Sequence, residues 1–559
     1  MMVDGTAIEG GAKVVAVHIE SIQGLVCYGW IGLDGTAFAD SYALTLRRGD
    51  EVLGEGWARG RRTDVERARG CGWGLAFQVP LDSRILDYLD QPLGLAVEGA
   101  GSIQVALTLP PFALGHLKAV RELDYWNPAA VAPTKLGMPR NAEDVANRTI
   151  LYVIHDAEGG AVATSQDLAL MVARRARVFM LRCGRTQWRL ETAVVDDGDD
   201  GIAVSRLDEV ETIEFERPWA QHILPDESRV AALQRIVQTL RPDVAHVRSV
   251  IYFSPELLVH LRPFVPRLIF SAHDFIALCL NGFLFNGDNK FCGGDCGGGT
   301  KRCLPADLDD SAPPLRGKSV YLWRARCLAA LDHVDAVVVT SQTTIDVFQS
   351  YVSAEILAKF HIIEHGRSAA DWPDKGAARP PTPLATEAPF RIVLVGAINE
   401  AKGALLVQDL SKAVAGGGFD AEIHVVGYMS LLISQSRSVV YGPYSRGRLP
   451  SILDRIAPTV GLVPVQWPET YSHVVTELAM SNIPMIASNF GAVGERVHAH
   501  NLGWVLPEMT VESIIELVNR LKANPGELEA RQQAVRRYRC RSEERMAEDY
   551  IDLYNPMSK

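Results

Sequence analysis

The sequence has no run of about 18 apolar residues, the length that a membrane-spanning helix requires. Its first residues, MMVDGTAIEGGAKVV, lack the basic start and the apolar core of a signal peptide. Positive charge is also scarce. The chain has 56 Lys and Arg against 67 Asp and Glu, which gives a formal net charge of −11. Since binding to phosphates requires clustered Lys and Arg, nucleic acid is not expected as the main partner. These absences predict a cytoplasmic protein, either soluble or peripheral at the inner face of the membrane.

Cysteine does not occur in a disulfide pattern. The nine Cys are odd in number and spread along 559 residues, unlike the framework of a small secreted protein. Hydrophobic residues make up 47% and charged residues 22% of the chain, which excludes a wholly disordered or fibrous protein. A chain of this length is expected to form about two to four domains.

The first part of the chain, residues 1–115, alternates short β-type runs with turns and shows no helical period. This pattern predicts an all-β sandwich domain. Four aromatic residues in it either stack on sugar rings or pack inside the domain, and packing is the favoured interpretation. They are Tyr28, Trp30, Trp57 and Trp73. Residues 116–148 lack periodicity and are predicted to be a linker.

From Thr149 the chain alternates continuous apolar strands with helices, which is typical of a parallel sheet covered on both faces. We expect one doubly wound, Rossmann-like lobe at 149–375, a hinge linker at 376–389 and a second such lobe at 390–559. Ligands of such α/β folds bind at the carboxyl ends of the strands.

The stretch Trp467–Val497 carries the most chemical information. It predicts a helix between two strands, with Glu469 in the loop before the helix and Glu477 about two turns along it. Thr470 or Ser472 can cap this helix. Its N-terminal N–H groups suit a phosphate, and a carboxylate further along suits the hydroxyls of a ribose.

The two glutamates, the flanking strands, Pro484 and the Gly491–Ala492 loop resemble the donor-site motif of retaining glycosyltransferases of the GT-B fold, in particular family 4. The resemblance implies transfer of a sugar, with retention, from a nucleotide-sugar donor to a glycan, lipid-linked saccharide or protein. It also implies bacterial surface-polysaccharide or glycoconjugate synthesis and the final helix crossing back to the first lobe. The β domain resembles an accessory module of some bacterial glycosyltransferases.

The resemblance assigns roles to individual residues. Glu469 would hold hydroxyls of the donor sugar and Glu477 the ribose. The flanking residues Thr470, Tyr471 and Ser472 would belong to the donor site. His273 would contact the donor sugar and the transition state.

Glycine-rich segments follow two of the predicted strands. Gly159 and Gly160 correspond to the glycine loop of the first lobe, where the backbone can approach a diphosphate. In the second lobe Gly396 precedes Lys402, whose ammonium would reach the diphosphate. The chain departs from the family here, because Ala397 stands where an Arg is usual, and Arg367 is a candidate replacement.

No catalytic metal or other cofactor is predicted. Asp-x-Asp pairs, which bind metal in transferases of another fold, occur at Asp197 and Asp199 and at Asp307 and Asp309, but neither follows an apolar strand. Four cysteines within one glycine-rich segment either bind structural zinc or remain reduced thiols in an active-site loop. They are Cys279, Cys292, Cys296 and Cys303.

Several alternatives remain open from the sequence alone. A nucleotide-sugar epimerase or hydrolase would use the same fold, and a catalytically silent glycan-binding protein would use the β domain. Arginines between Arg174 and Arg189 form either a membrane-binding surface or a solvated helix face. No motif specifies the donor base, the sugar or the acceptor.

Overall fold

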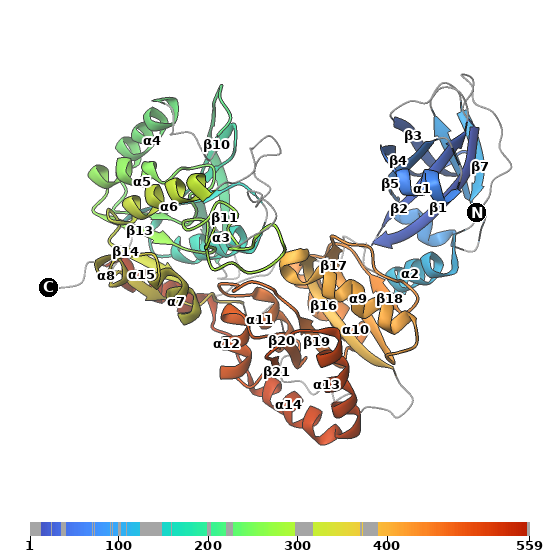
Figure 1. Ribbon diagram of the computed structural model, residues 1–559. Helices are drawn as coiled ribbons and strands as arrows, with labels where there is room; N and C mark the ends of the chain where they lie inside the picture. Colours follow the sequence, from blue (N-terminus) through green and yellow to red (C-terminus); the bar gives the residue numbers. More distant parts are fainter. Residues whose placement is uncertain are drawn as a thin grey trace. The chain divides into compact units, whose positions relative to one another are not determined.

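The computed structural model describes residues 13–23, 25–34, 41–69, 71, 73–89, 91, 93–98, 102–107, 109–122, 148–157, 159–197, 203–219, 227–296, 317–368, 372 and 389–555 (Figure 1). It divides into two compact units, each described here by itself. Unit 1 comprises Met1–Ala132, Arg379–Leu462 and Thr510–Pro525, and unit 2 comprises Pro133–Ala378, Val463–Met509 and Gly526–Lys559. The predicted fold class is confirmed, because an antiparallel β domain precedes two sheets with Rossmann-like strand orders.

The N-terminal β domain consists of one antiparallel sheet with the strand order β1-β2-β5-β4-β3-β6-β7. Its strands are β1 (Lys13–Gln23), β2 (Val26–Asp34), β3 (Ser41–Arg48), β4 (Glu51–Arg61), β5 (Trp73–Pro80), β6 (Leu93–Glu98) and β7 (Ser102–Leu107). Alternate side chains of β1 to β6 meet in one hydrophobic core, so the sheet curls around its own inner face. The β-rich character of this domain is therefore as predicted. The prediction was a sandwich of two sheets, whereas the hydrogen bonds join all seven strands into a single sheet.

Helix α2 (Pro111–Glu122) crosses the predicted end of the β domain at residue 115. Ala113 and Leu117 of this helix are buried in the core of the β domain. The first residues of the predicted linker are thus helical. This helix is stabilised by contacts with the sheet, which the sequence of the segment alone does not reveal. Residues 123–147 and 373–388, on which the linker predictions mainly rest, lie outside the described residues.

Unit 2 contains an eight-stranded sheet with the order β11-β10-β9-β8-β12-β13-β14-β15. Its strands are β8 (Thr149–His155), β9 (Arg177–Cys183), β10 (Gln187–Asp197), β11 (Ala203–Glu214), β12 (Val244–Val247), β13 (Arg267–Ser271), β14 (Ala336–Val339) and β15 (Phe360–Ile362). The helices between them are α3 (Gly160–Val172), α4 (Glu227–Leu240), α5 (Glu256–Leu261), α6 (Gly317–Leu331), α7 (Gln342–Gln349) and α8 (Ala354–Leu357). The strand order reverses between β8 and β12, which is where doubly wound folds bind ligands.

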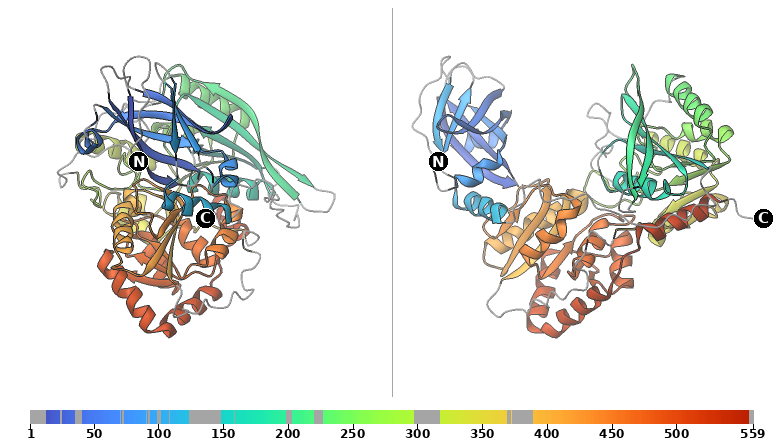
Figure 2. Two further views of the ribbon diagram at one scale, coloured as in Figure 1. Left: turned by 90° about the vertical axis from the view of Figure 1, so that its right-hand side faces the viewer. Right: turned by 180° about the vertical axis from the view of Figure 1, so that it is seen from behind.

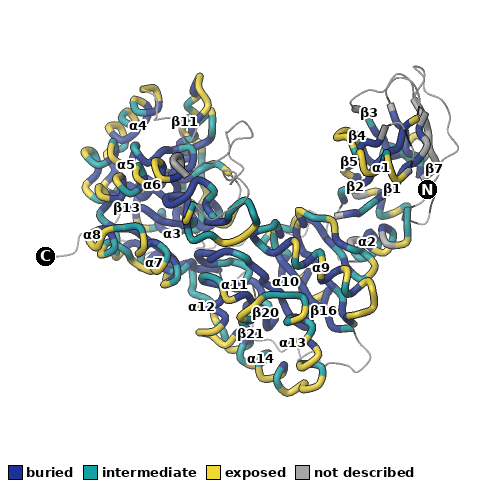
Figure 3. The backbone as a smooth tube through the Cα atoms, viewed as in Figure 1, coloured by how far each residue is buried: buried dark blue, intermediate teal, exposed yellow. Residues whose placement is uncertain are grey.

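A long antiparallel hairpin, β10 and β11, extends this sheet beyond β9 (Figure 2). The sequence did not predict it, because β11 carries many charged side chains and forms an edge, whereas the predicted strands were continuous apolar runs. Strands β8, β12 and β13 are those buried runs. Figure 3 colours buried residues dark blue.

The second Rossmann-like sheet has the order β18-β17-β16-β19-β20-β21. Its strands are β16 (Phe390–Ile398), β17 (Ala421–Met429), β18 (Ser438–Val440), β19 (Val460–Val463), β20 (Met485–Ser488) and β21 (Gly503–Leu506). Its helices are α9 (Ala404–Ala415), α10 (Leu449–Ile456), α11 (His473–Met480), α12 (Gly491–Ala499), α13 (Val511–Ala523) and α14 (Pro525–Arg537). Among the helices of the described ranges, none is long and apolar enough to cross a membrane.

The last helix, α15 (Glu543–Tyr554), packs against α3 and shares a hydrophobic core with β8. The Tyr554 hydroxyl lies 2.8 Å from both the Tyr152 hydroxyl and His246 Nδ1. His246 Nε2 in turn lies 2.7 Å from the Ser271 hydroxyl. This buried chain of hydrogen bonds links the end of the chain to three strands of the sheet.

Replacing Tyr554 with phenylalanine should lower the free energy of unfolding by about 1–3 kcal/mol, because two buried polar groups lose their partner. Tyr550→Phe is the matched control on the same helix. The Tyr550 hydroxyl is buried and has no hydrogen-bond partner among the described residues, so its removal should leave stability unchanged or raise it. Urea unfolding measures both variants, and equal midpoints would contradict the role of the network.

Candidate functional site

The N-terminus of α11 lies within unit 2 at the centre of the predicted donor motif. Ser472 is its N-cap residue, with a φ of 65°, and no side chain accepts a capping hydrogen bond there. Thr470 does not cap the helix, because its hydroxyl donates to the His273 carbonyl at 2.6 Å. The predicted open helix end is therefore present, and the first N–H groups of α11 have no side-chain cap.

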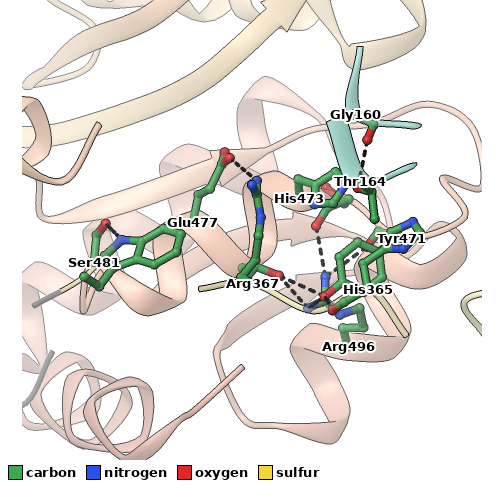
Figure 4. Close-up of polar contacts among 12 residues, drawn as sticks. Gly160, Thr164, His365, Arg367, Tyr471, His473, Glu477, Ser481 and Arg496 are labelled. Atoms are coloured by element: carbon green, nitrogen blue, oxygen red, sulfur yellow. Dashed lines mark hydrogen bonds and ion pairs between the residues drawn. The ribbon is translucent and has the colours of Figure 1, made fainter. Parts of the chain in front are cut away.

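Three imidazole rings form a stack beside this helix end. His273 follows β13, His365 follows β15, and His473 is the first residue of α11. The ring centroids of His273 and His365 lie 5.3 Å apart, and those of His365 and His473 lie 5.2 Å apart at an interplanar angle of 12°. Figure 4 shows two of these rings, His365 and His473, next to Tyr471. Sequence reasoning found His273 alone, because the other two come from distant segments.

The first two rings of the stack are held neutral. Burial, followed by the nearby positive charge of Arg248, lowers the pKa of both His273 and His365 well below the ordinary value. Neither ring nitrogen of His273 has a hydrogen-bond partner in the described part of the chain. A neutral imidazole with both nitrogens unengaged can donate one hydrogen bond to a ligand and accept another.

Gly159 and Gly160 come directly before and at the start of α3. Gly159 has a φ of 148°, a conformation that glycine adopts readily. A Cβ atom at Gly160 would lie 2.8 Å from Cδ2 of His473, so only glycine allows the ring to approach this closely. His473 Nε2 lies 3.1 Å from the Thr164 hydroxyl (Figure 4). The structure thus brings the predicted glycine loop and the predicted donor motif together.

Tyr471 connects two segments of the site through its side chain. Its hydroxyl donates to the His365 carbonyl at 2.8 Å, and the Arg496 guanidinium lies 3.9 Å above its ring. The same guanidinium donates to the carbonyls of Tyr471 and Ser472 (Figure 4). Arg496, which lies in the ERV end of the motif, was not singled out from the sequence. These contacts fix the backbone that leads into α11.

Glu477 forms a buried ion pair with Arg367. Its Oε1 accepts a hydrogen bond from Arg367 Nη2 at 2.7 Å, and the side chains are 8% and 3% exposed (Figure 4). Arg367 Nε and Nη1 have no partner within the described residues. Arg367, the candidate replacement for the Arg that is usual at position 397, therefore lies against Glu477, the carboxylate that is predicted to hold the ribose.

Glu469 is buried, and its backbone lies against the start of α12. Its carbonyl accepts a hydrogen bond from Ala492 N at 2.8 Å. A Cβ atom at Gly491, whose φ is 54°, would lie 2.5 Å from the same carbonyl oxygen. The predicted Gly491–Ala492 loop is therefore the first turn of α12, and the glycine permits the close approach.

Arg248, at the carboxyl end of β12, is a further residue that sequence reasoning did not identify. It is 1% exposed, and its Nε donates to the Ser165 hydroxyl of α3 at 2.6 Å. Its Nη1 and Nη2 have no hydrogen-bond partner in the described ranges. A buried cation with two unengaged nitrogens beside His273 favours an anionic ligand.

Asp274, the residue after His273, does not bond the imidazole ring of His273 in the described part of the chain. Its carboxylate instead accepts a hydrogen bond from Ile276 N at 2.8 Å, which closes a local turn. Burial raises the pKa of this carboxyl group to about 6.

The remaining predicted site residues belong to unit 1. Gly396, with a φ of 98°, lies near the end of β16, where a Cβ atom on the neighbouring Gly427 would meet its carbonyl. Lys402 ends a short 3-10 helix that the Asn399 side chain caps. Gly403 then takes a left-handed conformation and starts α9. Lys402 thus lies just before the N-terminus of α9, and its contact with a diphosphate stays a prediction.

The metal predictions are not decided by the structure. Within the described residues no group of three or more His, Cys, Asp or Glu side chains could hold a metal ion. Cys279 is buried, and Cys292 and Cys296 are half-buried. Cys303, Asp199, Asp307 and Asp309 lie outside the described residues. Structural zinc at the cysteines stays a prediction.

Two arginines of the predicted basic surface are paired. Arg182 Nε lies 2.7 Å from the Glu191 carboxylate, and Arg189 Nη2 lies 2.6 Å from that of Asp156. These ion pairs reduce the positive charge that this surface offers to an anionic membrane.

No protein-family model and no curated protein matches the sequence. Among solved structures, the chain is similar to the Anabaena protein HepE in complex with UDP, with 13% identity, a TM-score of 0.46, and 72% of this chain and 99% of that chain covered. It is similar to a sucrose-phosphate synthase from Thermosynechococcus elongatus, with 18% identity, a TM-score of 0.48, and 73% and 98% covered. The catalytic domain of starch synthase IV from Arabidopsis thaliana, bound to ADP and acarbose, has 12% identity, a TM-score of 0.44, and 73% and 99% covered. At these values the similarity assigns no function.

Proposed function

We propose that this protein is a retaining glycosyltransferase that moves a sugar from a nucleotide-sugar donor to a glycan, lipid-linked saccharide or protein acceptor. The observation that carries the proposal is the hydrogen bond from the Thr470 hydroxyl to the His273 carbonyl. It joins the predicted catalytic histidine to the loop that carries Glu469 and leads into α11, the helix that carries Glu477. The residues predicted separately for the donor sugar and for the ribose therefore share one part of unit 2.

The chemistry follows from the charge that develops when a nucleoside diphosphate leaves the sugar. Uncapped N–H groups at the start of α11 would stabilise the departing diphosphate. Glu469 would hold hydroxyls of the sugar, and Glu477 would accept the ribose hydroxyls. Neutral His273 would hydrogen-bond the sugar as its anomeric carbon gains positive charge. In this proposal the acceptor hydroxyl attacks from the face that the diphosphate leaves, without a metal or a covalent sugar intermediate. Its oxygen bonds to the anomeric carbon as the bond from that carbon to the diphosphate breaks, and its proton passes to the departing diphosphate.

A screen of nucleotide sugars by thermal unfolding tests the donor site. UDP-, ADP-, GDP- and dTDP-linked hexoses are added separately, and we expect one nucleotide class to raise the unfolding temperature. At about 100 times its Kd, such a donor stabilises the folded state by about 2.7 kcal/mol. No stabilisation by any donor would refute the proposal.

Incubation of the stabilising donor with the protein alone separates transfer from its nearest alternatives. A transferase consumes the donor slowly without an acceptor, whereas an epimerase or hydrolase converts it rapidly. The proposed place in bacterial surface-polysaccharide or glycoconjugate synthesis predicts that lipid-linked saccharides restore fast consumption. NMR of the product then shows whether the anomeric configuration is retained.

A further inference from the structure

The β domain carries a groove on the outer face of its sheet, away from the hydrophobic core. The groove has a volume of ≈ 730 Å³ and crosses strands β2 to β5. Its side chains include two aromatic rings and several polar groups. They are Tyr28, Thr45, Glu55, Trp57, Arg59 and Gln78.

The strand register places the two aromatic residues on either side of Gln78. Tyr28 of β2 pairs with Gln78 of β5, and Gln78 pairs with Trp57 of β4. Trp57 in turn pairs with Ala43 of β3. Since neighbouring strands lie about 4.8 Å apart, the backbone positions that carry the two rings are separated by about 10 Å across the sheet. Small residues such as Ala43 and Ala76 leave room for a ligand along the floor of the groove.

Trp57 is exposed although the domain has a well-formed core. Its exposed fraction is 54%, whereas that of Trp30 on β2 is 6%. Trp30 packs against Val65 of helix α1 (Thr63–Arg69) and against Cys71, so it is a packing residue, as the sequence favoured. Trp57 is not, and its exposed indole ring is accessible to a ligand in the groove.

The polar side chains of the groove are available for hydrogen bonding. The side chains of Glu55, Arg59 and Gln78 are exposed and form no hydrogen bond with another described residue. They offer one negative charge, one positive charge and one neutral amide. This balance does not favour a highly charged ligand such as nucleic acid, which requires clustered basic residues. It suits a ligand with many neutral hydroxyl groups.

We propose that this groove binds a saccharide chain. The flat faces of Trp57 and Tyr28 cover the apolar C–H faces of sugar rings, while the polar side chains bond the hydroxyls at the ring edges. The site goes beyond the proposed function, because it lies in the β domain and does not require sugar transfer.

Calorimetric titration of the whole protein with soluble hexasaccharides tests this proposal. The probes are maltohexaose, cellohexaose, laminarihexaose, chitohexaose and mannohexaose. We expect at least one to bind, and Trp57→Ala to weaken that binding by about tenfold, since an aromatic contact is worth up to about 1.5 kcal/mol. Gln78→Ala, at another exposed position of the groove, should also weaken binding. No binding by any probe would overturn the proposal.

Two further variants locate the bound saccharide. Tyr321→Ala removes an aromatic ring of α6 that is also more than half exposed, and it should bind the saccharide as the unchanged protein does. His273→Ala changes the proposed transfer site and should also retain saccharide binding. Loss of binding in His273→Ala together with unchanged binding in Trp57→Ala would place the saccharide at the transfer site and overturn the proposal. Thermal stabilisation of Trp57→Ala by the nucleotide-sugar donor tests the transfer site separately.

Discussion

Replacing His273 with alanine is expected to slow sugar transfer by about 10²–10³-fold while the protein stays folded. The protein should fold because neither ring nitrogen of His273 has a hydrogen-bond partner among the described residues. The rate should fall because the variant lacks the one imidazole that the proposal places against the donor sugar. Single-turnover kinetics with saturating donor measure the loss, and calorimetry shows whether donor affinity is retained.

The pH dependence of this loss is a second readout. Burial and the charge of Arg248 keep the pKa of His273 well below its usual value, so the ring is neutral at pH 7 and above. The ratio of the transfer rate of His273→Ala to that of the unchanged protein should therefore be the same at pH 7 and pH 8.5. His498→Ala, an exposed histidine of α12, is the matched control and should transfer sugar at the unchanged rate. Full activity of His273→Ala would remove the histidine from the mechanism.

Replacing Glu477 with alanine should lower the free energy of unfolding by about 3–5 kcal/mol, because Arg367 would be left as a buried, unpaired charge. The side chains of this pair are 8% and 3% exposed, so water cannot compensate for the lost carboxylate. Urea unfolding without donor measures the change. As a control, Lys412→Ala breaks an exposed ion pair with Asp409 and should cost less than about 1 kcal/mol.

A double variant separates the structural role of Glu477 from its proposed contact with the ribose. Arg367→Met with Glu477→Leu removes both charges and should recover most of the lost stability, because a buried ion pair contributes little net free energy. The same variant should not be stabilised by the nucleotide-sugar donor. If it is stabilised as strongly as the unchanged protein, Glu477 holds Arg367 and not the ribose.

The parts of the fold that the sequence predicted are those with strong local patterns. Strand β13, at Arg267–Ser271, is one of the continuous apolar strands expected after Thr149, because such a run in an α/β chain is most stable inside a parallel sheet. The hairpin β10–β11 was missed, because its stability comes from pairing between two partly charged strands and not from a pattern within either one.

The candidate site was predictable only residue by residue. Sequence spacing related Glu469 to Glu477 because a short helix separates them. It could not relate His273 to His365 and His473, since their stacking depends on the order of strands in the sheet and on the glycine at position 160. Arg248 was missed for the same reason, because burial and unengaged nitrogens are properties of the folded chain.

The docking of α15 has a consequence for the synthesis of the protein. The eight-stranded sheet is complete once Ile362 has been made, but the helix that covers part of its core ends at Tyr554. At about 5–20 residues per second the ribosome needs roughly 10–40 s to add the intervening residues. During that time the apolar surface around Tyr152 lacks its final layer. The nascent chain is therefore expected to bind chaperones at this surface until translation ends.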